Sequence, residues 1–202
     1  GATVKNLTLS VKIQKSAAVG GLISVTKGTA CTVENITVKG SISGGAANVA
    51  AIVGSATIAT TIRNCKNYAE VTNTTNFTAG ILGSSGAVVV IIDSCENYGT
   101  INSKGTFIGG IAGLPRKAEG SYVINCKNFG NVTGSAQVGG IAGATRVRIE
   151  NSYCLETALI NGKAASELTI YGNKTSGGVS NGSVASIVGQ IDDNGANGTT
   201  DC

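Results

Sequence analysis

The sequence predicts an all-β protein folded as a single parallel β-solenoid, a right-handed β-helix with about six coils of roughly thirty residues each. Three observations predict this fold: the composition, a repeat near thirty residues, and alternation of apolar residues inside each repeat. The 202 residues are 42% hydrophobic but only 4% aromatic, with 30 Gly and one Pro. Glycine combined with Val, Ile, Thr and Asn is typical of many short strands joined by tight corners.

The repeat consists of two blocks. The first block is clearest at 62–71, 92–101 and 123–132, which read IRNCKNYAEV, IDSCENYGTI and VINCKNFGNV. The second block follows at 77–83, 107–113 and 138–143, as FTAGILG, FIGGIAG and VGGIAG. Weaker copies begin at 4–13 with 19–24 and at 33–42 with 49–54, and a sixth coil begins at 149–154.

One apolar position of the second block measures the repeat length. Its residues are separated by 30, 29, 30 and 30 positions, and they are Leu22, Ile52, Ile81, Ile111 and Ile141. The next assigned member is Ile187 in VASIVG (184–189), 46 residues later, which predicts an insertion at about 155–183. The predicted solenoid therefore covers 1–189, followed by a polar C-terminal tail at 190–202.

Within each first block, residues of one parity are expected to point inward, and stacked coils then form ladders of equivalent side chains. Two such ladders are predicted in the core: Cys65, Cys95 and Cys126, and the amides Asn67, Asn97 and Asn128. The position just before the cysteine is Asn in five of six coils, which predicts a sharp corner in the left-handed conformation that Asn tolerates. These corner residues are Asn6, Asn35, Asn64, Ser94, Asn125 and Asn151.

The pattern C-x-N-x-G-x-V followed by G-G-I-A-G resembles the bacterial GLUG-type repeats of large cell-surface proteins. The resemblance covers roughly 4–154 and is strongest at 62–143, whereas the first two coils lack the Cys and the inner Asn. It implies a secreted, surface-attached, adhesin-like parallel β-helix module. Its expected partners are other surface proteins or glycans, and its expected location is extracellular or at the cell surface.

The sequence lacks the residues of most catalytic and metal sites. It has no His, which excludes Ser–His–Asp and Cys–His nucleophilic sites and removes the commonest zinc ligand. The cysteines never form a C-x-x-C pair, so neither a metal nor a cofactor is expected. The carboxylates are scattered, and only Glu70, Asp93 and Glu96 are candidates for an acidic cluster on stacked coils. The glycine-rich second blocks lack the Lys-Ser/Thr of a phosphate-binding loop.

Charge separates the two ends of the chain. Residues 1–50 carry a net charge of +4 and residues 149–202 a net charge of −4. Complementary ends would allow copies to stack head to tail. The simpler interpretation is that the charges at each end prevent its strand edges from pairing with other chains. The charged fraction of 13% is too dilute for a nucleic-acid-binding protein. No stretch approaches the roughly eighteen apolar residues of a membrane-spanning helix.

Cysteines and asparagines are the residues of this chain that could carry covalent bonds or modifications. The inward cysteine ladder is expected to stay reduced, because stacked strands lie about 4.8 Å apart whereas disulfide-bonded β-carbons lie about 3.8 Å apart. Cys154 and Cys202 are free of this constraint and are candidates for a disulfide. Eight Asn-X-Ser/Thr sequons could carry glycans if the source is eukaryotic: Asn6, Asn35, Asn73, Asn76, Asn131, Asn173, Asn181 and Asn197.

Together these observations predict a non-enzymatic extracellular structural and adhesion module that acts as a rigid spacer displayed at a cell surface. A self-assembling filament subunit that stacks head to tail is the alternative. A carbohydrate-active β-helix enzyme is a further, weaker alternative.

Overall fold

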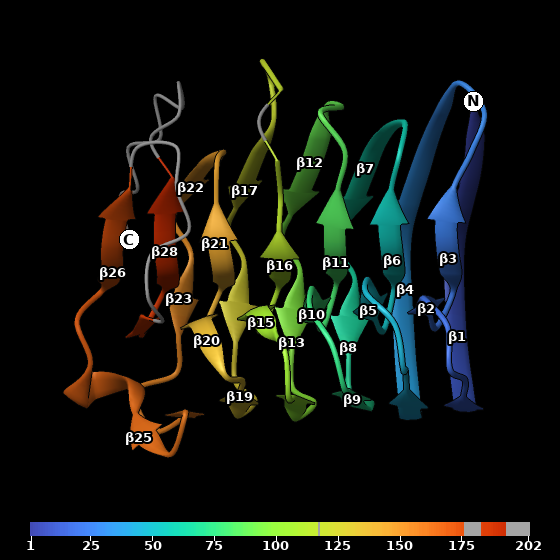
Figure 1. Cartoon of the computed structure of the whole chain (residues 1–202). Helices are drawn as coiled ribbons and strands as arrows, with labels where there is room; N and C mark the ends of the chain where they lie inside the picture. The colour runs from blue at the N-terminus through green and yellow to red at the C-terminus, as the bar shows by residue number, and fades with distance from the viewer. Residues whose placement is uncertain (117, 176–182, 193–202) are drawn as a thin grey trace.

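The computed structural model describes residues 1–116, 118–175 and 183–192. Its strands stack side by side along one axis, from β1 at the N-terminal end to β26 at the other end (Figure 1). The predicted parallel β-solenoid is confirmed, because strands one coil apart in the sequence pair in parallel along three walls. The one antiparallel pair among the described strands is β24 with β25.

Wall A is the longest wall, and it bends so that three short strands follow one another within most coils. Its strands are β1 (Ala2–Gln14), β4 (Ala30–Ser43), β7 (Ala59–Arg63), β8 (Lys66–Asn67), β9 (Glu70–Asn73), β12 (Val90–Asp93), β13 (Glu96–Asn97), β14 (Ile101–Ser103), β17 (Tyr122–Ile124), β18 (Lys127–Asn128), β19 (Val132–Thr133), β22 (Arg148–Glu150), β23 (Tyr153–Cys154), β24 (Leu159–Ile160) and β25 (Lys163–Ala164).

Walls B and C are built from the second blocks. Wall B contains β2 (Val19–Gly20), β5 (Val49–Ala50), β10 (Thr78–Ala79), β15 (Thr106–Gly109), β20 (Ala136–Gly139) and β27 (Val184–Ala185). Wall C contains β3 (Ile23–Thr26), β6 (Val53–Ala56), β11 (Leu82–Ser85), β16 (Ala112–Leu114), β21 (Ala142–Thr145), β28 (Val188–Asp192) and β26 (Tyr171–Thr175). The described helical structure is one short 3-10 turn, η1 (Ala165–Glu167), too short to cross a membrane.

The six corner residues predicted from the sequence all adopt positive φ. Their φ angles lie between 45° and 58°, for Asn6, Asn35, Asn64, Ser94, Asn125 and Asn151. A second row of positive φ occurs at the start of wall B, where Asn48 and Phe77 precede β5 and β10 and Phe107 and Gln137 are the second residues of β15 and β20. Phenylalanine is unusual in this conformation. The rings of Phe77 and Phe107 stack with centroids 5.2 Å apart, and this contact helps to hold the two corners in register.

The apolar second-block residues form a stack inside the solenoid. Ile81, Ile111 and Ile141 are completely buried. The amide of Ile81 donates to the carbonyl of Ile111 at 3.1 Å, and the amide of Ile111 donates to that of Ile141 at 3.0 Å. Next to this stack, a β-carbon added at Gly113 would lie 2.4 Å from the carbonyl oxygen of Gly83 and 2.8 Å from that of Phe107. Glycine is therefore required because the backbones of neighbouring segments touch there.

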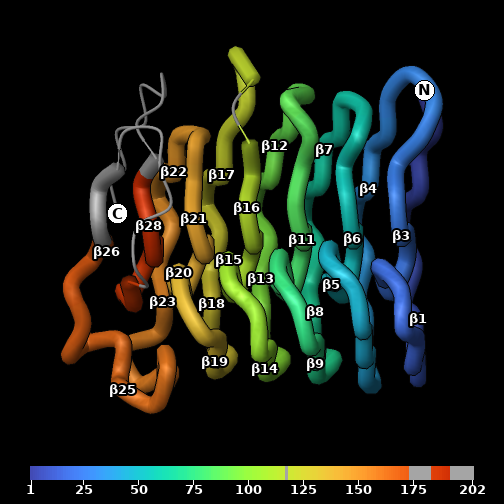
Figure 2. The backbone as a smooth tube through the Cα atoms, in the orientation of Figure 1, coloured from blue at the N-terminus to red at the C-terminus, as the bar shows by residue number. Residues whose placement is uncertain are grey.

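The last coil departs from chain order. In wall C, β28 lies between β21 and β26, although β26 comes earlier in the sequence (Figure 2). Ile187 follows Ile141 in the stack, since the amide of Ile141 donates to its carbonyl at 2.9 Å, and the amide of Ile187 donates to Ile170 at 3.1 Å. Ile170 stands 29 residues after Ile141, so it continues the repeat interval that the sequence analysis assigned to an insertion.

The region predicted as an insertion, 155–183, thus contains β24, β25, η1 and β26. Strand β28 continues to Asp192, three residues beyond the predicted end of the solenoid at 189. The rest of the predicted tail, 193–202, lies outside the described residues.

Candidate functional site

The cysteine ladder lies in the core. Cys65, Cys95 and Cys126 are completely buried free thiols. Each thiol donates a hydrogen bond to the carbonyl two residues earlier in its own coil, at 3.2 to 3.3 Å. Burial raises the pKa of the Cys95 thiol well above its ordinary value. A reactive cysteine needs a stabilised thiolate and access to solvent, so Cys95 has the environment of a structural thiol.

The inner asparagines form a continuous amide ladder. Asn67 Nδ2 donates to Asn97 Oδ1 at 2.8 Å, and Asn97 Nδ2 donates to Asn128 Oδ1 at 2.7 Å. Each Nδ2 also donates to a backbone carbonyl two residues later in its own coil. All three amides are completely buried, so these bonds remove the desolvation cost that an unpaired amide would carry.

The ladder ends at Cys154, which pairs with Asn128 in the β18–β23 register. Asn128 Nδ2 donates to the Cys154 sulfur at 3.3 Å, and burial raises the pKa of this thiol. Cys154 therefore belongs to the amide row, while Ser152 takes the place of a cysteine and accepts the Cys126 amide at 3.0 Å. Cys202, the partner considered for a disulfide with Cys154, lies outside the described residues.

The corner ladder is exposed and only partly continuous. Asn35 Nδ2 donates to Asn6 Oδ1 at 2.9 Å, and Asn125 Nδ2 donates to Asp93 Oδ1 at 3.1 Å. Ser94 replaces Asn in one coil, and its hydroxyl also donates to Asp93 Oδ1, at 2.8 Å. Together with Asn64, these side chains hold the corner of the rod and face solvent.

An aromatic row runs along the outside of wall A, one residue after the amide ladder in three coils, and Tyr153, one residue before Cys154 in the next coil, lies at its end. Tyr68 stacks on Tyr98, and Tyr98 stacks on Phe129, with centroids 4.6 Å apart in both pairs. Tyr153 meets Phe129 edge-on at 6.0 Å. The three tyrosines are 38% to 45% exposed. This row was not predicted from the sequence, although the aromatic residue follows the inner Asn in three consecutive coils.

Charged side chains flank the aromatic row. Lys66 Nζ lies 2.8 Å from Glu96 Oε2, and the Tyr98 hydroxyl donates to the same oxygen at 2.8 Å. Burial opposes ionisation of Glu96, but the bonds from Lys66 and Tyr98 outweigh it and hold its pKa below the ordinary value. Lys127 Nζ lies 5.6 Å from the centre of the Tyr153 ring. The result is an exposed aromatic surface bordered by two lysines.

The candidate acidic cluster is divided among separate rows. Glu70 lies beside Ser41, and Asp93 beside Arg63. Glu96 lies between Lys66 and Lys127. No row brings two of the three carboxylates next to each other, so their register provides no acid–base pair of the kind that glycosidic bond cleavage uses.

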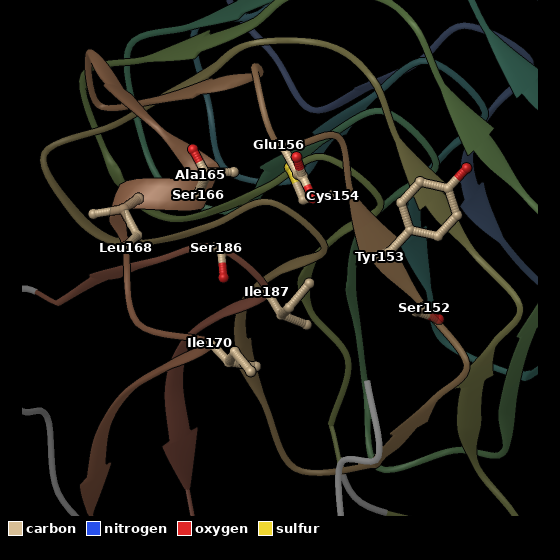
Figure 3. Close-up of a pocket in the computed structure, with 10 residues that line it drawn as sticks. All are labelled: Ser152, Tyr153, Cys154, Glu156, Ala165, Ser166, Leu168, Ile170, Ser186 and Ile187. Atoms are coloured by element: carbon tan, nitrogen blue, oxygen red, sulfur yellow. The ribbon is translucent and has the colours of Figure 1, made fainter.

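A pocket of about 260 Å³ opens at the last coil, between wall A and the segment that leads to β26 (Figure 3). Wall C extends one strand further than wall B, and this difference leaves space above Cys154 and Ile187. Two of the hydroxyls that line the pocket are already bonded: Ser152 donates to the Glu150 carbonyl at 2.8 Å and Ser186 to the Thr169 carbonyl at 3.1 Å. Leu168 and Ile170 supply apolar lining, and Glu156 and Ser166 add polar groups to it.

The sequons differ in accessibility. Asn6 and Asn35 are exposed, whereas Asn73 is 95% buried and its Nδ2 donates to the Thr78 hydroxyl at 3.0 Å, which leaves no room for a glycan. Asn76 and Asn131 use their Oδ1 atoms to accept the amides of Thr106 and Leu159. Asn173 lies in β26, and the remaining candidates, Asn181 and Asn197, lie outside the described residues.

Within the part of the chain that the structure describes, no group of three or more Cys, Asp or Glu side chains is placed to bind a metal ion. Comparisons with protein-family models, with curated proteins and with solved structures found no match for this chain. Inference about its function therefore depends on the geometry of the rod and its surface.

Proposed function

We propose that this chain is a non-enzymatic structural and adhesion module that acts as a rigid spacer outside the cell. The observation that carries the proposal is the aromatic row on wall A, formed by Tyr68, Tyr98 and Phe129 on a hydrogen-bonded frame, with Tyr153 edge-on against Phe129 at its end. Exposed aromatic residues bordered by cations are typical of recognition surfaces. The resemblance to GLUG-type repeats supports a secreted, surface-attached location, and surface proteins or glycans are the proposed partners.

The frame supports the spacer role. Neighbouring coils are joined by parallel strand pairing on all three walls, and the inner amides add side-chain bonds along the same axis. Six coils at about 4.8 Å per step give a rod of roughly 25 to 30 Å, the size of one module in a longer array.

The C-terminal end favours the spacer over the head-to-tail filament. Strand β25 pairs on β24 in wall A, and β26 pairs on β28 in wall C. These two strands occupy the places that the first coil of a stacked copy would take. Whole-coil stacking would therefore require both to move.

Adhesion is tested by measuring binding of the purified chain to a glycan array. Tyr98→Ala removes the middle of the aromatic row, and Tyr122→Ala is the matched control because Tyr122 lies on β17, outside the row. We expect binding that Tyr98→Ala weakens about tenfold or more and that Tyr122→Ala leaves within about twofold. Binding that Tyr98→Ala leaves as strong as in the wild-type chain would refute a role for this surface.

The non-enzymatic part of the proposal is tested by incubating the chain with pectin, alginate and glycosaminoglycans. We expect no lyase or hydrolase products, because the carboxylates are separated and histidine is absent. Turnover that disappears in Glu70→Gln or Asp93→Asn would overturn this part and would favour the enzyme alternative.

A further inference from the structure

The cysteines of the core ladder occupy the same place in three consecutive coils. Their backbones are paired in register, since the amide of Glu96 donates to the Cys65 carbonyl and the amide of Lys127 to the Cys95 carbonyl, both at 2.9 Å. Each thiol donates to the carbonyl two residues earlier, so the three side chains point the same way. Equivalent atoms on stacked strands are separated by the strand spacing of about 4.8 Å.

This ladder has three thiols and two gaps between them. In the coil before Cys65 the position holds Ile36, and in the coil after Cys126 it holds Ser152, whose hydroxyl accepts the Cys126 amide. The thiol of Cys95 interacts with those of Cys65 and Cys126 on either side. Cys95 therefore borders both gaps, whereas each of the other two thiols borders one.

The spacing of the sulfurs matches a metal bridge between two thiolates. A metal–thiolate bond is about 2.3 Å long in zinc sites, so two such bonds in line span about 4.6 Å, close to the coil spacing of about 4.8 Å. Side chains stand roughly perpendicular to a sheet. A line along the rod from one sulfur to the next therefore meets each Cβ–Sγ bond at roughly a right angle, which suits a sulfur atom that forms two bonds.

Ligand number and charge select the kind of ion. Thiolates favour soft metal ions, and zinc takes four tetrahedral ligands, whereas each gap offers two sulfurs inside the apolar core. A divalent ion that takes two ligands in line forms a neutral complex with two thiolates. A monovalent ion would leave one negative charge in the core, where an unpaired charge is unfavourable. The mercuric ion is soft, divalent and two-coordinate.

The carbonyls that accept from the thiols have other partners. Cys95 donates to the Asp93 carbonyl and Cys126 to the Ile124 carbonyl. The same two carbonyls accept the backbone amides of Asn64 and Ser94, at 3.1 and 3.0 Å. A metal ion that replaces the two thiol protons therefore leaves both carbonyls hydrogen-bonded, which avoids the cost of an unpaired buried acceptor.

We propose that two neighbouring thiols of this ladder form a linear binding site for a soft divalent metal ion, with Cys95 as a ligand in either gap. On binding, two sulfur–hydrogen bonds break, two sulfur–metal bonds form and two protons pass to solvent, with no transfer of electrons. Because both gaps need Cys95, one chain holds one ion. The ladder is completely buried, so the ion enters while the chain folds. This site does not depend on the proposed adhesive role.

The test uses mercuric chloride and a parent chain that carries Cys31→Ser, Cys154→Ser and Cys202→Ser, so that the ladder supplies the remaining thiols. The parent is refolded from urea with one equivalent of the ion and desalted in excess mercaptoethanol, which removes metal from exposed thiols. We expect retention of about one ion per chain by elemental mass spectrometry, with two sulfur ligands at about 2.3 Å in X-ray absorption. A folded parent that retains no ion would overturn the proposal.

Single replacements in this parent locate the site, with Val as the substitute because the position already holds Ile36 in another coil. Cys95→Val leaves Cys65 and Cys126 about 9.6 Å apart, too far for one ion, and should lower retention at least about tenfold. Cys65→Val and Cys126→Val each keep one gap and should retain the ion as the parent does.

All three variants lose one thiol, so the number of thiols cannot explain a difference between them. Circular dichroism melting verifies that each variant is folded, and Cys95→Ala provides the same comparison with a smaller side chain. Equal retention by folded Cys95→Val and Cys126→Val would show that the ion is not held between neighbouring coils and would refute the assignment.

Discussion

Asn97→Ala probes the amide ladder at its centre. Asn97 accepts a hydrogen bond from Asn67 at 2.8 Å and donates to Asn128 at 2.7 Å and to the Gly99 carbonyl at 2.9 Å. The truncation removes all three bonds inside a core where none of the groups reaches water. Asn128 Oδ1 is then left without the donor that it has in the wild-type chain.

The magnitude follows from these contacts. Three lost bonds at about 1 kcal/mol each, plus about 1 to 3 kcal/mol for a buried acceptor left unpaired, predict a loss of about 4 to 6 kcal/mol in the free energy of unfolding. Asn102→Ala is the control, because Asn102 is exposed on the same wall one strand further along the coil, and we expect a change of about 0.5 kcal/mol or less. Urea unfolding followed by circular dichroism measures both.

A triple replacement sharpens the test. The same row holds Leu9 and Val38 in the first two coils, so the position accepts apolar side chains. Replacing Asn67, Asn97 and Asn128 together with Val removes the donors and acceptors of the side-chain ladder in pairs and leaves only their backbone partners unpaired, so we expect a loss well below three times that of Asn97→Ala. Equal costs for Asn97→Ala and Asn102→Ala, or additive costs in the triple variant, would refute a cooperative ladder.

Three further predictions concern the core. Ile111→Asp puts an unpaired charge into the completely buried isoleucine stack and should cost several kcal/mol, so cooperative melting near the wild-type temperature would contradict that assignment. Because burial raises the pKa of Cys95 in the folded chain, the unfolded chain loses the thiol proton first, from about pH 8.5. The free energy of unfolding should therefore fall by up to about 1.4 kcal/mol per pH unit above that value. In Cys95→Ala the free energy of unfolding should fall less steeply over the same pH range. Alkylation in denaturant without reductant, followed by mass spectrometry, should label Cys65, Cys95 and Cys126 in full. A disulfide between any two of them would rule out a reduced ladder. The same spectrum tests the predicted Cys154–Cys202 disulfide.

Much of the fold could be predicted from the sequence because each solenoid position repeats one local environment. Asn6, Asn35 and Asn64 recur at a corner with positive φ, and the residue type alone predicts that conformation. The inward parity of the first block likewise located Cys95 and Asn97 in the core. Repetition turned a weak local preference into a strong signal.

The last coil was harder to predict because two segments compete for the same place. Ile170 and Ile187 both fit the second-block position, and the sequence alone gives no reason for the later one to lie next to Ile141. The Phe77 and Phe107 corners were missed for a different reason, since bulky residues rarely adopt positive φ and their stacking depends on the neighbouring coil. The aromatic row likewise depends on side chains from several coils.

The placement of β28 has a consequence for synthesis on the ribosome. Coils one to five can stack in the order in which they emerge, because each pairs with a strand already made. Strand β26 emerges before β28 and meets the free edge of β21 at the usual interval of the chain. If β26 pairs there first, β28 must displace it to reach the native order, and this exchange can begin only after residue 192 has been translated.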